Sequence, residues 1–232
     1  MNDAPSITVP GRAIKAATYF MSADETRYVL KGVHLCRAGG HNIVVAADGR
    51  QMLVLTLSGD TEPWPDGFKL TLVPKHVLTM MAEHGGSGDD LEIAQIDEKR
   101  VRVKGMIGDT KVVSWEIVTE CTDWVGTYPS WWKVLPEPCA PEKRVTAHIS
   151  LNPERLAQIK DAFGVWLKRE PILTLHMPEV SADGTIGVIA ITTSRQDALA
   201  LLMPCRGDLT ERIPDFVAEV VKAGNEQKGA KP

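Results

Sequence analysis

The sequence predicts an α+β fold made of three repeated units, each with a short apolar strand, one helix and three further strands. Three X-Pro pairs mark the helix starts, at Pro10, Pro74 and Pro153. Proline suits the first helical position because the N–H that it lacks would have no helical partner there. Glycine-containing turn signals then separate short runs of strand-forming residues. Three units of one plan indicate duplication, so we expect a stack of such units.

The composition is that of a globular protein with a sizeable core. The chain has 232 residues, 44% of them hydrophobic, and a formal net charge of −4. The total charge therefore does not indicate a nucleic-acid partner, although a local basic surface can still attract phosphates. No apolar run is long enough to cross a membrane and the N-terminal residues lack a secretory signal, so we expect a cytoplasmic protein with no membrane partner.

The cysteines show no metal or disulfide pattern. Cys36, Cys121, Cys139 and Cys205 are scattered along the chain without C-x-x-C spacing. This spacing argues against a zinc site and against a disulfide framework. We expect free thiols, no metal and no cofactor.

The first unit (unit 1) is predicted over residues 6–57. Its helix is expected over residues 10–21, with Ile14, Ala17 and Met21 facing the core. Turn dipeptides at Gly39-Gly40 and Asp48-Gly49 divide the sequence that follows. The predicted strands are 6–9, 27–36, 42–47 and 51–57.

The second unit (unit 2) repeats this plan over residues 68–118. Its helix is expected over 74–84, with Gly85-Gly86 as the stop signal. Arg100 to Lys104 alternates basic residues with valine, which predicts one buried and one cationic face for that strand. The predicted strands are 68–73, 91–96, 100–106 and 111–118.

Residues 119–144 break the repeat and are predicted to be a connector. They are rich in proline and aromatic residues, and solvated linkers avoid the latter. We therefore expect the connector to pack against the protein through four aromatic side chains, Trp124, Tyr128, Trp131 and Trp132.

The third unit (unit 3) is predicted over residues 145–206. Its helix is expected over 153–163, with Asn152 as N-cap and Gly164 as terminator. Its predicted strands are 145–151, 172–177, 185–192 and 197–203. A short amphipathic helix over 213–221 and a disordered tail over 224–232 are expected to follow. The predicted organisation is therefore 1–118 as one domain of two units, 119–144 as connector, 145–206 as half a domain, and 207–232 as helix and tail.

Three stretches resemble the bacterial DNA polymerase III beta sliding clamp family, and together they span residues 6 to about 206. The first stretch is ITVPGRAIKAATYFMSADETRYVLKGVHL followed by VVAADGRQMLVL, which is similar to the start of that family's middle domain. Tyr128 to Pro136 is similar to the connector that leaves this domain, and Leu201 to Arg206 to the closing Met-Pro-x-Arg motif. The resemblance implies a DNA-clamp fold, with helices on one face lining a central hole and antiparallel sheets on the other.

The resemblance also implies basic residues that face duplex DNA. Without it, an ordinary solvated helix face is the better interpretation, since exposed lysine and arginine are common. With it, these side chains are expected to contact phosphates without reading sequence. The implied DNA contacts are Arg12, Lys15, Arg27, Tyr28, Lys75, His76, Arg155 and Lys160.

A second implied site is an apolar pocket on the outer face that takes up a short motif from polymerases and other clamp-binding proteins. The matching positions are Leu30, Ala47, Gly49, Arg50, Met52, Pro129, Lys133, Val134, Leu201, Met203, Pro204 and Cys205. Gln51, Met52 and Cys205 depart from the family, which usually has Arg, Leu and Met there, and these changes are expected to alter the preferred motif. The alternative is that all of these are core and turn residues, because the same residue types are common in packed interiors.

The unit count raises the question of assembly. A full clamp chain of the family has six units, and two chains close a ring of twelve. A lone half-domain exposes a sheet edge, which either self-association or the extra helix over 213–221 would cover. We expect self-association, in which unit 3 of one copy completes unit 3 of another. Four copies would then supply twelve units. The expected partners are double-stranded DNA, a DNA polymerase or other proteins with a clamp-binding motif, and a clamp loader.

An enzyme and a binding module are the two alternative classes of function. An enzyme is not expected, since His76, Glu83 and His84 lack the H-E-x-x-H spacing and no nucleophile, P-loop or dinucleotide motif is present. The closer alternative is an adaptor or decoy that binds clamp-binding motifs without encircling DNA.

Overall fold

Three helices and two antiparallel sheets make up the part of the chain that the computed structural model describes, which is residues 6–57, 61–84, 90–107, 112–123, 126–135, 151–176, 187–193 and 197–204. The helices are α1 (Gly11–Thr18), α2 (Lys75–His84) and α3 (Pro153–Leu167), with 3-10 helices η1 (Tyr28–Lys31) and η3 (Trp131–Val134). The strands are β1 (Ser6–Pro10), β2 (Val33–Ala38), β3 (His41–Ala47), β4 (Gln51–Thr56), β5 (Lys69–Leu72), β6 (Asp90–Gln95), β7 (Arg100–Ile107), β8 (Val112–Glu120), β9 (Thr174–His176), β10 (Ile189–Thr192) and β11 (Ala198–Leu202).

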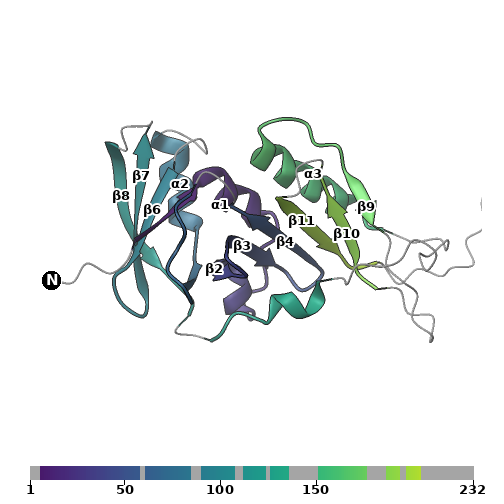
Figure 1. Cartoon of the computed structure of the whole chain (residues 1–232), viewed down its shortest axis with the longest axis horizontal. Helices are drawn as coiled ribbons and strands as arrows, with labels where there is room; N and C mark the ends of the chain where they lie inside the picture. Colours follow the sequence, from purple (N-terminus) through teal and green to yellow (C-terminus); the bar gives the residue numbers. More distant parts are fainter. Residues whose placement is uncertain are drawn as a thin grey trace, which may run out of the picture.

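The sheets show how the units join. One sheet has the order β1-β6-β7-β8, and the other has the order β5-β2-β3-β4-β11-β10-β9. The leading strand of unit 1, β1, pairs with β6 of unit 2, while the leading strand of unit 2, β5, pairs with β2 of unit 1. Units 1 and 2 therefore exchange their leading strands. Unit 3 joins unit 1 through the antiparallel pair β4 and β11, and β8 and β9 lie toward opposite ends of the molecule (Figure 1).

The middle strands are buried on both faces. In β3, Val44 faces one core cluster and Val45 the other, and in β4, Leu53 and Met52 divide in the same way. Sequences such as MLVL are therefore continuously apolar, whereas a strand with one solvent-exposed face would alternate apolar and polar residues. The first cluster lies under the helices, and the second lies under the connector.

Helix α1 packs against α3 at the junction of units 1 and 3. Its Ala13, Ala16 and Ala17 are fully buried, and these small side chains allow close approach of the neighbouring helix and strands. Figure 1 shows α2, α1 and α3 following one another along one side of the molecule. The predicted α+β class, with repeated helices and antiparallel strands, is confirmed by this arrangement.

Several predicted element bounds were wrong. The strand predicted over 27–36 begins only at Val33, because an Asp24 turn and η1 precede it. The Asp24 carboxylate accepts hydrogen bonds from the Thr26 N–H at 2.9 Å and the Thr26 hydroxyl at 2.7 Å, which favours a turn over an extended chain. Gly32 then allows the backbone to pass close to Thr71 and Leu72, where a Cβ atom would lie within 3.0 Å of both.

Helix α3 is longer than predicted. It continues through Gly164 to Leu167, and Lys168 supplies the left-handed C-cap with φ 55°. Trp166 is buried in the main core, and burial of a side chain of this size outweighs the cost of about 1 kcal/mol for glycine in a helix. The predicted strand over 145–151, apart from Leu151, and the helix over 213–221 lie outside the described residues.

Candidate functional site

A concave apolar pocket of about 210 Å³ lies where the β3–β4 turn, η1, the connector and unit 3 meet. Nine of the twelve positions predicted for the peptide pocket line it: Leu30, Ala47, Gly49, Arg50, Met52, Pro129, Val134, Leu201 and Met203. Lys133 and Pro204 are not among the lining residues, and Cys205 lies outside the described part of the chain. Segments separated by more than 150 residues in the sequence thus form one concavity.

Five lining residues were not predicted for the pocket: Gln51, Tyr128, Ser130, Trp131 and Val188. The buried aromatic residues of the connector were a usable signal, because Tyr128 and Trp131 were expected to pack against the protein and do so. Trp132 is instead exposed, and Trp124 lies outside the described residues. Val188 could not be found from the sequence, since it directly precedes β10 and only the pairing of β10 with β11 brings it to the core cluster that contains Leu201.

Strand pairing sets the floor of the pocket. Met52 lies opposite Ala47 on one side and Leu201 on the other. The β3–β4 turn is fixed by the Asp48 carboxylate, which accepts hydrogen bonds from the N–H groups of Arg50 at 2.8 Å and Gln51 at 2.9 Å. Gly49 has φ 88°, a conformation that favours glycine.

An aromatic stack supports the connector wall of the pocket. The Tyr128 ring lies parallel to the His34 ring, with centroids 4.5 Å apart. His34 Nδ1 is 3.0 Å from the Thr71 hydroxyl, and Thr71 Oγ1 is 3.0 Å from an Asp123 carboxylate oxygen. Burial lowers the pKa of His34 to about 4. This effect of burial is larger than that of the Asp123 charge, which acts in the opposite direction. His34 is therefore neutral at pH 7, and burial raises the pKa of Tyr128 so that its phenol is neutral as well.

Two of the predicted DNA contacts meet at the same turn. Arg155 on α3 forms an ion pair with the Asp48 carboxylate, and Arg27 donates a hydrogen bond from Nη1 to the Asp48 carbonyl at 3.0 Å. Gln158 Oε1 accepts hydrogen bonds from Arg155 Nη1 at 3.3 Å and from Gln51 Nε2 at 3.0 Å. These contacts, which we call the Asp48 network, join unit 3 to the turn that lines the pocket.

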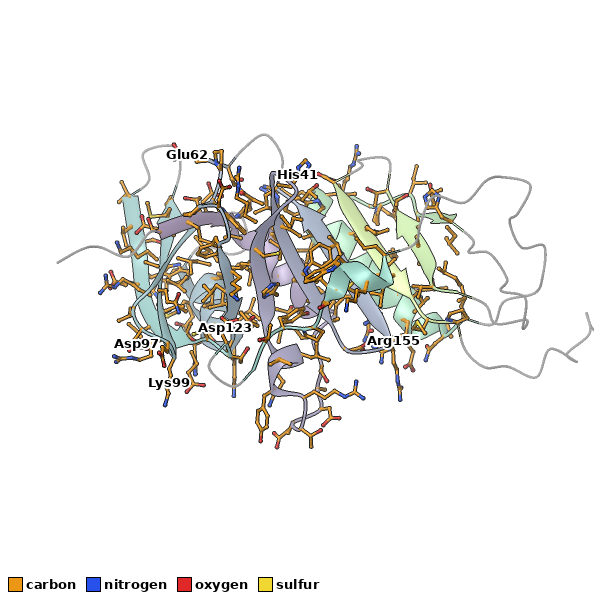
Figure 2. The ribbon with its side chains drawn as sticks, turned by 60° about the horizontal axis from the view of Figure 1, so that its bottom comes forward. His41, Glu62, Asp97, Lys99, Asp123 and Arg155 are labelled. Carbon is orange, nitrogen blue, oxygen red and sulfur yellow. The ribbon has the colours of Figure 1, made fainter. Side chains whose placement is uncertain are left out.

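The other predicted DNA contacts are spread over the three helices and η1. Arg12 lies over the Trp166 ring at 5.1 Å, and Lys160 makes only a long pair of 3.8 Å with exposed Glu170. Lys15 and Tyr28 are exposed, as are Lys75 and His76 at the start of α2. In Figure 2, Arg155 is labelled toward the unit 3 side of the molecule, and Asp97 and Lys99 toward the opposite end.

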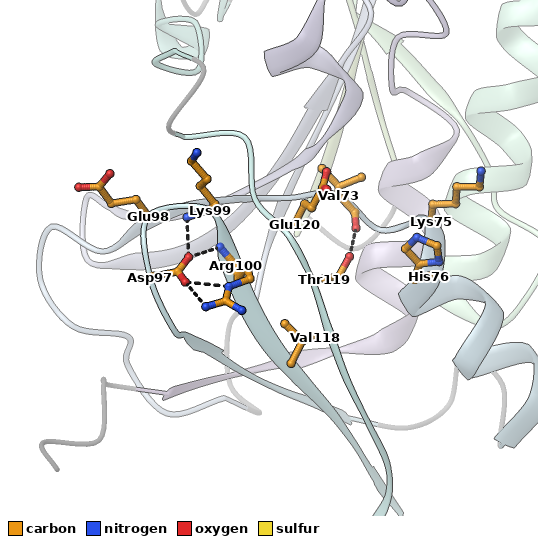
Figure 3. A pocket seen from close by; sticks show the side chains of 10 residues that line it. All are labelled: Val73, Lys75, His76, Asp97, Glu98, Lys99, Arg100, Val118, Thr119 and Glu120. Atoms are coloured by element: carbon orange, nitrogen blue, oxygen red, sulfur yellow. Dashed lines mark hydrogen bonds and ion pairs between the residues drawn. The ribbon is translucent and has the colours of Figure 1, made fainter.

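A second, larger concavity of about 830 Å³ lies beside the start of α2. Lys75 and His76 approach it from α2, Glu98 from the β6–β7 turn, and Val118 and Glu120 from β8 (Figure 3). This lining carries charges of both signs, unlike the apolar pocket. The concavity therefore differs in character from a purely basic phosphate site.

The predicted cationic face of β7 is neutralised by pairing. Val101 and Val103 are fully buried, as expected from the alternation. Arg100 pairs with Asp97 at 2.6 Å, Arg102 with Glu116 at 3.2 Å, and Lys104 with Glu92 at 3.0 Å. The outer surface of this sheet therefore carries ion pairs in place of free basic groups at these three positions.

The described residues offer little support for a metal site, a reactive thiol or a membrane-spanning helix. They contain no group of three or more His, Cys, Asp or Glu side chains placed to hold a metal ion. Burial raises the pKa of Cys36 to about 11, so this thiol stays protonated and is a poor nucleophile at pH 7. No helix in the described ranges is long and apolar enough to cross a membrane.

Comparison with known structures assigns this arrangement of strands and helices to the DNA-sliding-clamp fold. No protein-family model and no curated protein matches the sequence. Among solved structures, DNA polymerase III subunit beta from Borrelia burgdorferi, in complex with a natural product, aligns with a TM-score of 0.64 at 11% identity, covering 88% of this chain and 64% of that chain. The Pseudomonas aeruginosa protein gives 0.62 at 15% identity over 89% and 68%. A sliding clamp from Bartonella birtlesii bound to griselimycin gives 0.57 at 14% identity over 89% and 67%.

The chain therefore has the fold of the DNA polymerase III beta sliding clamp, and the resemblance inferred from its sequence is confirmed at the level of the fold. It spans about two thirds of the length of the clamp chains that it matches. The peptide and DNA contacts assigned to individual residues stay predictions.

Proposed function

We propose that this protein is a sliding-clamp-like DNA processivity factor. It would surround duplex DNA without sequence specificity and tether a polymerase, or another protein with a clamp-binding motif, at the outer pocket. The observation that supports the proposal most directly is the pocket itself. It is formed where the β3–β4 turn, the connector and unit 3 meet, in a chain that has a clamp fold. Apolar lining with flexible Met52 and Met203 suits an extended peptide with alternating apolar side chains.

The proposed DNA surface consists of the exposed basic residues on the helices. Lys15 on α1 and Lys75 and His76 on α2 are exposed. Contacts of this kind are sequence-independent and weaken as salt rises, which suits a protein that must slide. We assign no catalytic role, and we place the protein in the cytoplasm with its DNA, polymerase and loader partners.

A ring requires more than one copy of a three-unit chain. In units 1 and 2, the three later strands of each unit pair with the leading strand of the other unit. β1 of unit 1 pairs with β6 of unit 2, and β5 of unit 2 pairs with β2 of unit 1. In the described part of unit 3, β9 lies at the edge of its sheet and receives none. We propose that unit 3 of a second copy completes this half-domain, so that four copies supply twelve units.

Retention on DNA tests the proposal. The protein is loaded on nicked circular DNA with a clamp loader and separated by gel filtration, and the circle is then cut once. Retention on the circle with loss after linearisation is expected for a topological clamp. Equal binding to circular and linear DNA, or none to either, contradicts it.

The adaptor alternative is favoured by one observation. Arg27 and Arg155, two of the predicted DNA contacts, are both engaged by the Asp48 turn. An adaptor would bind clamp-binding peptides and show no difference between circular and linear DNA. The same retention experiment, run beside a peptide-binding measurement, therefore separates the two functions.

A further inference from the structure

One end of the molecule presents a surface that unit 2 leaves uncovered. We call it the unit 2 edge, and it consists of the outward edge of β8 and the start of α2. In the described residues, β8 pairs with β7 alone along Val112 to Val118, and only its final residues reach Val73. Val112, Val113 and Val118 are 61%, 46% and 48% exposed.

Such an edge is unusual for a protein that stays alone. An edge strand offers unpaired N–H and C=O groups, and proteins normally blunt it with lysine, proline, a bulge or short length. β8 has nine residues and contains neither lysine nor proline. Its one register shift places an extra residue, Ser114, in β8 opposite Gly105/Met106, so this bulge lies near the start of the strand and the edge from Trp115 onward is regular.

The chain already covers the equivalent surface once, in unit 1. There the last strand, β4, pairs with β11, the last strand of unit 3, and α1 packs against α3. Arg12, two residues after the helix-start Pro10, lies over Trp166 at this junction. β8 is the last strand of unit 2, and His76 is two residues after Pro74, so the unit 2 edge corresponds to the surface that unit 3 covers on unit 1.

We propose that the unit 2 edge pairs with the same surface of a second copy, with β8 antiparallel to β8 about a two-fold axis. The last strands of units 1 and 3, β4 and β11, already pair with each other. Within the described part of the chain, β8 is therefore the one unit-terminal strand whose outer edge has no partner strand along most of its length. A two-fold interface must be complementary to itself. The adjoining concavity meets this condition, since it is lined by both Lys75 and His76 and by Glu98 and Glu120 (Figure 3), and none of these four forms an ion pair within the described ranges.

This interface differs from the association through unit 3, and the two lie toward opposite ends of the molecule (Figure 1). Alternation of the two contacts around four copies would close a ring with two-fold symmetry at every junction. Only this consequence rests on the proposed function. The β8 pairing itself needs neither DNA nor a peptide.

Light scattering on the full chain tests the pairing. Val118→Lys places a charge on the edge, and Trp132→Lys is the matched control because Trp132 is also an exposed apolar residue, 59% against 48% for Val118, but lies on the connector. The wild type is expected at two or four times the chain mass of 25.4 kDa, with Val118→Lys at half of the wild-type mass and Trp132→Lys unchanged. Circular dichroism melting shows whether each variant folds. A monomeric wild type at high concentration, or a folded Val118→Lys variant of wild-type mass, overturns the proposal.

Cross-linking gives a second readout that does not depend on destabilising the edge. Cys139 and Cys205 are replaced by serine, and one cysteine at a time is placed at Val113, Ser114, Glu116 or Val118. Antiparallel pairing about a two-fold axis sets the β8 residues closest to the axis next to the same residues of the second copy. At least one of the four positions is therefore expected to form a disulfide-linked dimer. A cysteine at Trp132 is expected to form none. Absence of a cross-link at all four positions overturns the β8 pairing. A cross-linked dimer without retention on circular DNA would instead contradict the proposed function and leave the pairing in place.

Discussion

Removal of the Arg155 guanidinium should destabilise the protein through the Asp48 network. The side chains of Arg155 and Asp48 are 24% and 11% exposed, so their ion pair lies between a surface pair and a buried one. Surface pairs contribute about 0 to 1 kcal/mol, and loss of one partner of a buried pair costs about 3 to 5 kcal/mol. Because Asp48 keeps its two backbone N–H donors, we expect Arg155→Met to lower the free energy of unfolding by about 2 kcal/mol, or Tm by roughly 4–8 °C.

A double-mutant cycle isolates the ion pair. Asp48→Asn keeps an oxygen that can accept the turn hydrogen bonds and removes the charge. Urea denaturation of wild type, Asp48→Asn, Arg155→Met and the double variant should give a coupling energy of about 1–2 kcal/mol. Lys160→Met is the control, because its pair with Glu170 is long and exposed and should contribute under about 0.5 kcal/mol.

The same variants report on the pocket. Both Asp48→Asn and Arg155→Met should weaken binding of a labelled clamp-binding peptide, since the turn that they loosen carries Gly49 and Arg50 of the lining. A coupling energy near zero, or equal destabilisation by Lys160→Met, would refute the reasoning that this network joins unit 3 to the turn.

Three further predictions concern the pocket and its support. Met203→Glu should reduce peptide affinity at least about 100-fold with little change in Tm, because Met203 is 50% exposed on the rim; unchanged affinity by fluorescence anisotropy would exclude this pocket as the peptide site. His34 has its folded pKa lowered to about 4, below the unfolded value of 6.5, so stability is fully present above pH 6.5 and is lost as pH falls toward 4. Urea titrations at pH 7 and pH 5 should therefore show about 2 kcal/mol more acid destabilisation in wild type than in His34→Gln, and equal losses would contradict the burial argument. Gly49→Ala should destabilise the fold and weaken peptide binding, since its Cβ would meet the Arg27 guanidinium at positive φ, whereas Gly39→Ala, also at positive φ but in open space, should cost only the strain of about 1 kcal/mol.

Local signals in the sequence predicted the helices and the turns, whereas most of the pocket lining was predicted from the resemblance to the clamp family. Proline at residues 74 and 153 and the glycines at 39, 40 and 49 act through their own backbone preferences, so they can be recognised without knowledge of the fold. The Asn152 side chain caps α3 by accepting hydrogen bonds from Glu154 and Arg155 N–H groups, as its type and position suggested.

What the sequence could not show depends on contacts between distant segments. The partner of Arg155 is Asp48, 107 residues away, and nothing near either residue indicates that pairing. The α3 helix passes Gly164 because Trp166 packs in a core whose other walls come from units 1 and 2. His34 was predicted only as a strand residue, and its stack on Tyr128 exists because the connector folds back over β2.

These distant contacts give unit 3 a specific part in the site. Leu201 and Met203 form one wall of the pocket, and Arg155 fixes the turn that forms another, so units 1 and 2 alone would hold only part of the lining. The β4–β11 pair that joins unit 3 to unit 1 also sets Leu201 opposite Met52 in the pocket floor. Any change that separates unit 3 from unit 1 should therefore abolish peptide binding, although units 1 and 2 stay joined by their exchanged leading strands. The pocket is accordingly a property of the junction between repeats, and unit 3 is needed to complete its lining.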